Sequence, residues 1–393
     1  MKISSVDILK LKEHPEHGQT PVLVRINTDE GIYGYGEAGV SIGNYSLGSI
    51  EILKSFSRMI LGRDPLQNDV IYEKLAHAFW SKGNGGVIYA AISAIDAALW
   101  DIKGKYFNKP VYELLGGKHR DKIRAYASQL QNGWKYEQFI GSPGDLEFLK
   151  HAVQSAVDEG YDCVKIDFLA KHLDGSRIDF YEGRNHLSLK TLREVDQKLD
   201  AVKQIIDGKA ELILENHCIT TAHTAIQFAK VAEDYGPMLL EEPADPQDIH
   251  DYEKLREAIN IPLATGERIY TRREFLPYLE KNLLDVLQPD LGNCGGITEG
   301  RKIADLAELY GVSVQTHTCN TALSVAIALH LEAAIPNFII HEHHTSNTFK
   351  HNREDFVYDY QPVNGYFELP TLPGLGNEPT EKTLAESQVE TVQ

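Results

Sequence analysis

Hydrophobic and polar positions follow different patterns in successive parts of the chain. Over the first 40 residues the apolar positions form short runs typical of strands, at residues 2–11, 22–27 and 32–37. Asp29-Glu30-Gly31 lies between the last two runs and predicts a hairpin turn. Helical spacing follows, most clearly over residues 87–102, and Leu114-Leu115-Gly116-Gly117 indicates a helix end. The pattern predicts an N-terminal α+β domain over residues 1–121.

From residue 122 the chain alternates between short apolar runs and amphipathic segments. Residues 122–129 and 163–167 predict the first two strands, and Asp145 and Gly160 predict the two ends of the helix between them. Continued to Glu342, the alternation predicts eight strands. We therefore expect an α/β chain in which a (β/α)7β barrel of the TIM type spans residues 122–363. Residues 364–393 are expected to pack back on the first domain.

Charged side chains end six successive apolar runs of the predicted barrel. They are Glu215, Glu241, Glu267, Asp290, His317 and Glu342. The intervals between them are 26, 26, 23, 27 and 25 residues, about the length that one strand, its helix and two loops need. In a closed barrel all six reach the C-terminal rim. The three glutamates that come first would repel one another without a cation, and hard divalent ions prefer oxygen ligands. The sequence therefore predicts Mg2+ at those three glutamates.

One insertion breaks the regular spacing. Lys165, on the second predicted strand, and Glu215, on the third, lie 50 residues apart, and the polar stretch from Leu169 to Leu189 fills the difference. Insertions on a barrel rim usually shape access to the substrate.

Composition and charge narrow the class of partner. The 393 residues are 42% hydrophobic and carry a formal net charge of −18, which argues against nucleic acid and membrane surfaces as partners. An anionic substrate stays compatible, since a bound metal and a few local cations can dominate the field in a cleft. No apolar run approaches the roughly 20 residues of a membrane span, and the N-terminus has no signal-peptide core. The four cysteines show no disulfide or metal spacing, which predicts a reduced, cytoplasmic protein.

Several segments together resemble the enolase superfamily, in its mandelate racemase subgroup, over essentially the whole chain. The segments of the barrel are Leu240-Glu241-Glu242-Pro243, Ala264-Thr265-Gly266-Glu267-Arg268, Leu287-Gln288-Pro289-Asp290 and Gly295-Gly296-Ile297-Thr298. Those of the N-terminal domain are Ala98-Leu99-Trp100-Asp101-Ile102-Lys103-Gly104-Lys105 and Leu114-Leu115-Gly116-Gly117. The resemblance implies that the N-terminal domain caps the barrel. Glu215-Asn216-His217 is similar to galactonate and mannonate dehydratases.

The resemblance implies a reaction through an enediolate. Mg2+, helped by Lys165, would stabilise that intermediate while His317 removes the proton next to the substrate carboxylate and Asp290 orients the imidazole. His217 would donate a proton to the leaving β-hydroxyl, and Glu342 would bind the substrate carboxylate or the enediolate, if protonated or through a bridge. If the strand stays extended through residue 217, alternation puts His217 on the side of the metal ligand two residues earlier. The product would be a 2-keto-3-deoxy sugar acid.

Departures from the family pattern bear on the reaction and the substrate. Racemases of the subgroup have a second lysine two residues after Lys165, where this chain has Asp167, which favours dehydration over racemisation. Mannonate dehydratases of the related type use a Tyr–Arg base from the long loop. Here that loop contains Tyr181, Arg177 and Arg184.

The expected substrate is a small sugar acid. The side chains expected to contact it are Asn44, Gln129, His317 and Glu342. Two alternatives stay open, namely a cycloisomerase or epimerase of the same superfamily, and a divergent member with a regulatory or binding role. A homo-oligomer is expected.

Overall fold

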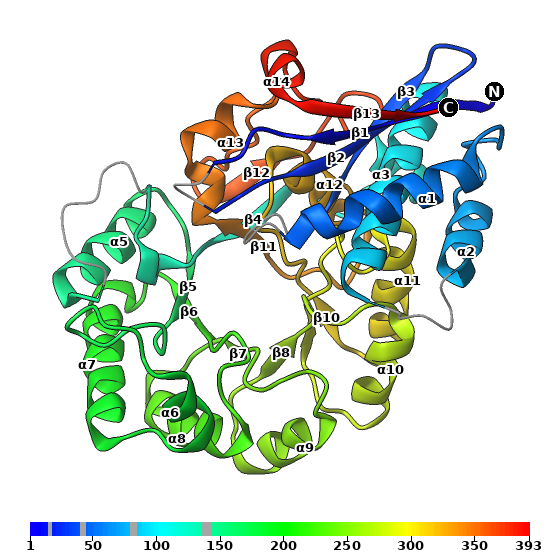
Figure 1. Cartoon of the computed structure of the whole chain (residues 1–393). Coiled ribbons are helices and arrows are strands. Elements are labelled where there is room, and N and C mark those ends of the chain that lie inside the picture. The colour runs from blue at the N-terminus through cyan, green and yellow to red at the C-terminus, as the bar shows by residue number, and fades with distance from the viewer. Residues whose placement is uncertain (15–17, 40–44, 79–84, 136–143) are drawn as a thin grey trace.

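Two sheets organise the chain in the computed structural model, which describes residues 1–14, 18–39, 45–78, 85–135 and 144–393 (Figure 1). The first sheet is antiparallel and has the strand order β13-β1-β2-β3. The second follows the order β10-β9-β8-β7-β6-β5-β4-β11 through parallel pairs, with β12 added antiparallel to β4. Eight parallel strands therefore curl into the barrel-type sheet that the sequence predicts, and the fold class is confirmed.

The strands are short, as expected for a barrel and its cap. Their bounds are β1 Ile3–Lys10, β2 Val22–Thr28, β3 Tyr33–Ala38, β4 Lys122–Ser128, β5 Cys163–Asp167, β6 Glu211–Glu215, β7 Leu239–Glu241, β8 Leu263–Thr265, β9 Val286–Leu287, β10 Ser313–Val314, β11 His341–His344, β12 Tyr366–Glu368 and β13 Gln388–Val392.

Helices cover the outside of the barrel and one face of the antiparallel sheet (Figure 1). Their bounds are α1 Ser49–Ile60, α2 Asn68–Ala78, α3 Gly86–Phe107, α4 Val111–Leu114, α5 Leu146–Asp158, α6 Phe180–Asn185, α7 Leu189–Ile206, α8 Ala222–Ala232, α9 Ile249–Ala258, α10 Arg272–Glu280, α11 Gly296–Leu309, α12 Ala322–Ala334, α13 Lys350–Glu354 and α14 Glu381–Glu386. None of those in the described ranges combines the length and apolarity that crossing a membrane requires.

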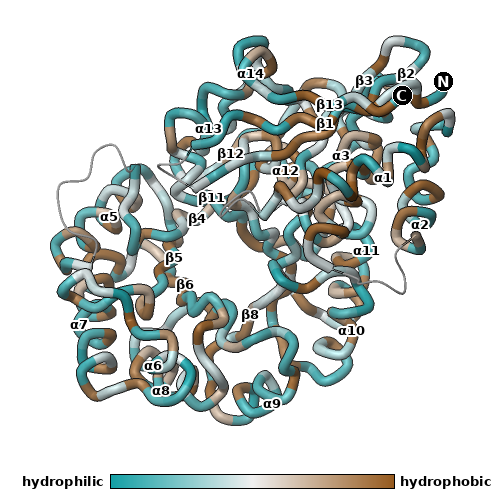
Figure 2. Tube along the Cα trace, viewed as in Figure 1, coloured by the Kyte–Doolittle hydropathy of each residue, from teal (hydrophilic) through white to brown (hydrophobic). Residues whose placement is uncertain are grey.

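The predicted elements of the N-terminal part are present with small shifts at their ends. The three predicted strands are β1, β2 and β3, and the predicted helix over residues 87–102 is the longer α3. Hydrophobic residues gather where α1, α2 and α3 meet the antiparallel sheet (Figure 2). The domain boundaries stay a prediction; the segment after residue 364 includes β13, which pairs with β1.

The six consecutive strands β4 to β9 each contribute one buried side chain to a common cluster, and Ile340, just before β11, adds a seventh. Its buried members are Tyr126, Cys163, Ile213, Leu239, Ala264, Val286 and Ile340. The ring closes where Val314 of β10 bridges to Phe338, just before β11. Parallel strands end on the same rim, so this packing fixes the side chains that follow each strand.

Two carboxylates from the N-terminal part bind the first turns of barrel helices. Asp96 of α3 accepts hydrogen bonds from Thr298 N at 2.9 Å and Thr298 Oγ1 at 2.5 Å, at the start of α11. That helix begins after Gly295, which has φ 114° and offers no side-chain cap. Glu37 of β3 accepts from Thr321 Oγ1 at 2.6 Å and Thr321 N at 3.3 Å, where α12 begins. The N-terminal part thus caps α11 and α12, and these contacts hold it on the barrel.

Candidate active site

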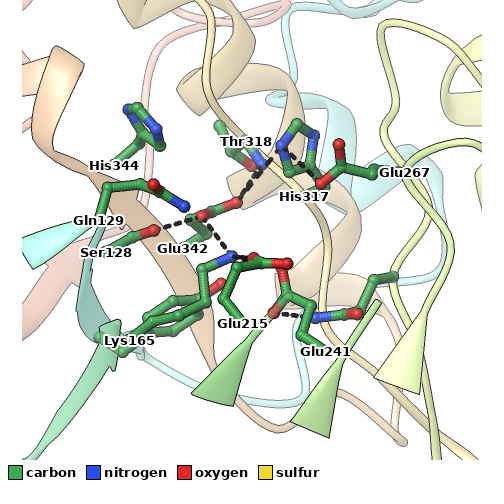
Figure 3. Close-up of polar contacts among 12 residues, drawn as sticks. Ser128, Gln129, Lys165, Glu215, Glu241, Glu267, His317, Thr318, Glu342 and His344 are labelled. Carbon is green, nitrogen blue, oxygen red and sulfur yellow. Dashed lines mark hydrogen bonds and ion pairs between the residues drawn. The ribbon is translucent and has the colours of Figure 1, made fainter. Parts of the chain in front are cut away.

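Four buried charged side chains lie on β5, β6, β7 and β11, two of them at the last residue of their strand (Figure 3). Lys165 Nζ lies 2.9 Å from Glu215 Oε2, 3.0 Å from Glu342 Oε1, and also against Glu241. Each of the four is at most 2% exposed. Glu215 and Glu241 are direct register partners in the β6–β7 ladder, which is why their carboxylates meet. One lysine faces three carboxylates, so the cluster carries excess negative charge.

That excess shows in the pKa values of the glutamates. Burial and the neighbouring Glu215 raise the pKa of Glu241 well above its usual value. Burial would also raise the pKa of Glu215, but His217 and Lys165 lower it below the usual range. Two adjacent buried carboxylates cannot both ionise without a compensating cation. Glu215 Oε2 moreover accepts no aligned hydrogen bond despite its burial. This donor set fits a hard divalent cation.

Glu267, the third predicted metal ligand, points differently from the first two. Its carboxylate lies 2.6 Å from Arg268 and 3.3 Å from His317 Nε2. The structure therefore brings Glu215 and Glu241 together and places Glu267 beside the predicted base (Figure 3). Within the described ranges, one group of metal-type ligand atoms lies within 4.8 Å of one another; it comprises Asp290, His317 and Cys319.

The predicted contact between His317 and Asp290 is present. His317 Nδ1 lies 2.7 Å from Asp290 Oδ2, and Asp290 Oδ1 accepts a 2.6 Å hydrogen bond from Gly292 N. Burial alone would lower the pKa of His317, but Glu267 and the other acidic groups around it raise that pKa well above its ordinary value. The dyad is held at both ends, with Nε2 turned toward the glutamates.

His217 reaches the site, although not by the predicted route. The strand ends at Glu215, and His217 has a left-handed backbone with φ 43°, so the assumption of an extended strand through residue 217 is wrong. Its Nδ1 lies 2.8 Å from Asp167 Oδ2 and its Nε2 3.9 Å from Glu215 Oε2. Burial would lower the pKa of His217, whereas Glu215 and Asp167 raise it to about 10.

Glu342 accepts from three donors at once. They are Ser128 Oγ at 2.6 Å, Thr318 N at 3.0 Å and Lys165 Nζ at 3.0 Å. Burial would raise its pKa, but Lys165 and His317 lower it below the usual range. An ionised Glu342 cannot donate to a substrate, which leaves action through a bridge such as Lys165. Sequence reasoning missed Ser128 and Thr318, because a hydroxyl or a backbone amide at a strand end carries no distinctive signal.

The predicted substrate contacts differ in their placement. Gln129, with φ 69° and 5% exposure, turns its Nε2 to His217 Nε2 at 3.2 Å. Asn44 lies outside the described residues. His344, which the sequence did not single out, lies on the same rim (Figure 3); its Nδ1 is 3.1 Å from Ser346 N, and burial lowers its pKa to about 4. A neutral His344 accepts at Nδ1 and therefore carries its proton on Nε2.

The insertion places its aromatic and basic residues at the surface. Tyr181 is 70% exposed on α6, a helix that packs against α8. Arg184 lies over the ring of Phe180, 5.6 Å from its centroid. Among the described residues, Tyr181 makes no contact with the charged cluster that would support a Tyr–Arg base from this loop.

Two family models together match most of the chain. Residues 147–383 match the family described as enolase C-terminal domain-like, and residues 6–116 match the mandelate racemase/muconate lactonizing enzyme N-terminal domain. The chain is 32% identical to a D-xylonate dehydratase of Haloferax volcanii, over 90% of this chain and 82% of that protein. It is 30% identical to a D-gluconate dehydratase of Thermoproteus tenax, over 94% and 70% respectively.

Solved structures extend the likeness to the whole fold. A member of the enolase superfamily from Salmonella Typhimurium superposes with a TM-score of 0.94 at 42% identity and covers 100% of both chains. The 3,6-anhydro-D-galactonate cycloisomerase of Zobellia galactanivorans superposes with a TM-score of 0.83 at 26% identity, over 99% of this chain and 100% of that one.

Proposed function

The chain belongs to the mandelate racemase/muconate lactonizing enzyme family of the enolase superfamily, and we propose on that premise that it is a Mg2+-dependent dehydratase of acid sugars. The dehydratase relatives support the reaction class. The observation that carries the proposal is a pair of imidazole–carboxylate dyads, His317–Asp290 and His217–Asp167, both near the Lys165 cluster. Removing a proton and a hydroxide from one substrate needs a base and an acid, and two dyads provide them.

Glu215, Glu241 and Glu267 would hold the metal. The first two share Lys165 as a cationic partner, and its single positive charge does not neutralise both carboxylates. When bound, Mg2+ supplies Lewis acidity for the substrate carboxylate.

His317 removes the proton at C2 in its neutral form, for which a bound cation would have to offset the glutamate charge that raises its pKa. It acts through Nε2, which faces Glu267 at 3.3 Å, because Nδ1 is engaged by Asp290 at 2.7 Å. Lys165 stabilises the negative charge that develops on the substrate carboxylate, from a buried position where electrostatic interactions are strong. Glu342 holds Lys165 in place and anchors the loop of Thr318.

His217 then protonates the leaving hydroxyl at C3. Hydroxide is a poor leaving group near neutral pH, and a positioned acid contributes roughly 10²–10⁴-fold. Elimination yields an enol that tautomerises to a 2-keto-3-deoxy sugar acid. The resemblance of Glu215-Asn216-His217 to galactonate and mannonate dehydratases favours an aldonate of that type as substrate.

A second candidate function keeps the first step and changes the outcome. The cycloisomerase relative, similar over nearly the whole chain, supports cycloisomerisation or epimerisation without loss of water. A divergent member with a regulatory or binding role is the third candidate. The proposal includes a homo-oligomer as the assembly. It also includes a reducing cytoplasm as the location, which agrees with the four free cysteines.

A screen of C4–C6 aldonates and aldarates in deuterium oxide with Mg2+ tests these candidates. A dehydratase gives a 2-keto acid from at least one substrate. Deuterium incorporation at C2 or lactone opening without a keto acid would favour the isomerase. If the folded, metal-loaded protein yields neither, the dehydratase proposal fails and a binding role remains.

A further inference from the structure

Four residues next to the charged cluster form a closed ring of hydrogen bonds. Asp167 N donates to Gln131 Oε1 at 3.1 Å, and Gln131 Nε2 donates to Gln129 Oε1. Gln129 Nε2 contacts His217 Nε2 at 3.2 Å, and His217 Nδ1 returns to Asp167 Oδ2 at 2.8 Å. The ring thus begins and ends on one residue.

The direction of every bond in the ring follows from one backbone group. The amide N–H of Asp167 can only donate, so the atom facing it is the oxygen of Gln131. The Gln131 amide nitrogen must then donate to Gln129, whose own nitrogen must donate to His217. His217 Nε2 is consequently an acceptor in the closed ring, and the ring proton sits on Nδ1, facing Asp167.

Burial, a further hydrogen bond and two unusual backbone conformations hold the residues of the ring in place. Asp167 is 6% exposed and its second oxygen accepts a 2.9 Å hydrogen bond from Leu169 N, which fixes the carboxylate. Gln129 and His217 both have positive φ, 69° and 43°, a conformation that costs energy for residues other than glycine. Two such backbones turn their side chains toward each other.

We propose that Gln131 and Gln129, together with Asp167, are positioning residues that hold the imidazole of His217 for the elimination step. This deepens the proposed function and rests on it for the role of His217. In this proposal the first role of Gln129 is to orient His217, and any contact of Gln129 with substrate is secondary. Asp167 holds Nδ1 while Nε2 carries the proton for the leaving group, and Gln129 contacts Nε2 again once that proton has been given away.

Gln131→Met tests the ring without touching a group that faces the cluster. Methionine keeps the size of the side chain and removes both hydrogen bonds. With an acid sugar that the enzyme dehydrates, we expect kcat for dehydration to fall about 10-fold, a fraction of what a positioned acid contributes. KM and C2 deuterium exchange should stay within about twofold, because His317 is not in the ring.

Gln227→Met is the matched control. Gln227 Oε1 also accepts a backbone amide, Leu187 N at 3.1 Å, and its Nε2 also contacts a histidine nitrogen, His186 Nδ1 at 3.2 Å, but on α8 outside the site. Loss of these bonds should leave both dehydration and exchange unchanged. Equal losses in Gln131→Met and Gln227→Met would show a general structural effect and overturn the proposal.

A readout independent of turnover separates this inference from the proposed function. The Nδ1 proton of His217, assigned in 15N-labelled protein by its absence from His217→Asn, should exchange slowly with water in the parent protein. It should exchange at least several-fold faster in Gln131→Met and unchanged in Gln227→Met. Gln131→Glu, which keeps the acceptor for Asp167 N and removes the donor to Gln129, should behave like Gln131→Met and serves if that variant does not fold. Unchanged exchange of that proton in both Gln131 variants would overturn the positioning role of the ring, whether or not any acid sugar proves to be a substrate.

Discussion

Asp290 Oδ2 lies 2.7 Å from His317 Nδ1, and the opposite nitrogen of the same imidazole lies 3.3 Å from a carboxylate oxygen of Glu267. The ring is therefore clamped between an acid that orients it and an acid proposed as a metal ligand. Its reactive nitrogen is the one on the side of the charged cluster, which is the arrangement a base at C2 requires.

Replacing either member of that dyad should stop proton abstraction. We expect His317→Asn to abolish C2 deuterium exchange and Asp290→Asn to lower it on the order of 10³-fold, since the imidazole loses its tautomer and its orientation. Proton NMR of an acid sugar in deuterium oxide measures both. Exchange that persists in His317→Asn would move the base to Lys165 or to the loop after β5.

His217→Asn should separate the two half-reactions. Exchange at C2 should continue at a rate within about threefold of the parent, while keto-acid formation falls by roughly 10²-fold or more, because only the acid is lost. Exchange and elimination are followed in the same sample. If both disappear together from a folded protein that still binds Mg2+, His217 positions the carboxylate or acts as a base, and the isomerase candidate gains.

Each predicted metal ligand should be needed for Mg2+ binding and not for folding. Glu215→Gln, Glu241→Gln and Glu267→Gln should lose Mg2+ binding by calorimetry and lose activity, while circular dichroism stays that of the parent. Glu257→Gln, on the exposed side of α9, is the control. Full Mg2+ affinity in Glu267→Gln would remove that residue from the ligand set.

Lys165→Met should make stability depend on divalent cations. Without the amine, three buried carboxylates lose their common partner, and breaking a buried pair of this kind costs about 3–5 kcal/mol. We expect a lower Tm than in the parent, with a larger rise on adding Mg2+. Lys254→Met removes a lysine that is 64% exposed and pairs with Asp251 near the surface, and it should change Tm little. A Lys165→Met protein as stable as the parent without Mg2+ would contradict the prediction.

Glu37 should make stability fall with rising pH. Burial raises its pKa from 4.5 to about 8 in the folded protein, despite the hydrogen bonds from Thr321. The folded state therefore keeps a proton that the unfolded state has released, so the contribution is full below about pH 4.5 and is lost as pH rises toward 8. The slope is about 1.4 kcal/mol per pH unit for one proton.

Glu37→Gln mimics the protonated acid and lacks this titration. Urea unfolding of both proteins from pH 5 to pH 8 should show the glutamine variant gaining on the parent as pH rises. A constant difference across that range would mean that Glu37 does not keep its proton in the folded protein.

The sequence predicted the parts of the fold that depend on burial. Strands β1–β5 and helix α3 follow directly from apolar spacing, since the same periodicity decides which side chains leave water. The positions of Glu215, Glu241 and Lys165 followed for the same reason, because each lies in or at the end of a buried strand.

Other parts depend on information that spacing does not contain. The positive φ of His217 turns the backbone where the alternation of side chains assumes a continuing strand, and the local sequence does not predict this turn. The orientation of Glu267 is decided by its neighbours Arg268 and His317, one of them from another strand end. Gln131 looks like an ordinary loop residue until Asp167 and Gln129 are seen on either side of it.

Asp96 and Thr298 lie 202 residues apart in the chain, yet the carboxylate of one completes the first turn of a helix that belongs to the other. During synthesis α3 is therefore made long before the helix that it caps. Most of the barrel must be made before Asp96 can contact Thr298. Contacts of such long range form late and slow folding. Because Glu37 and α12 repeat the arrangement, two contacts between residues far apart in the chain join the N-terminal part to the barrel, and we expect the two parts to unfold together.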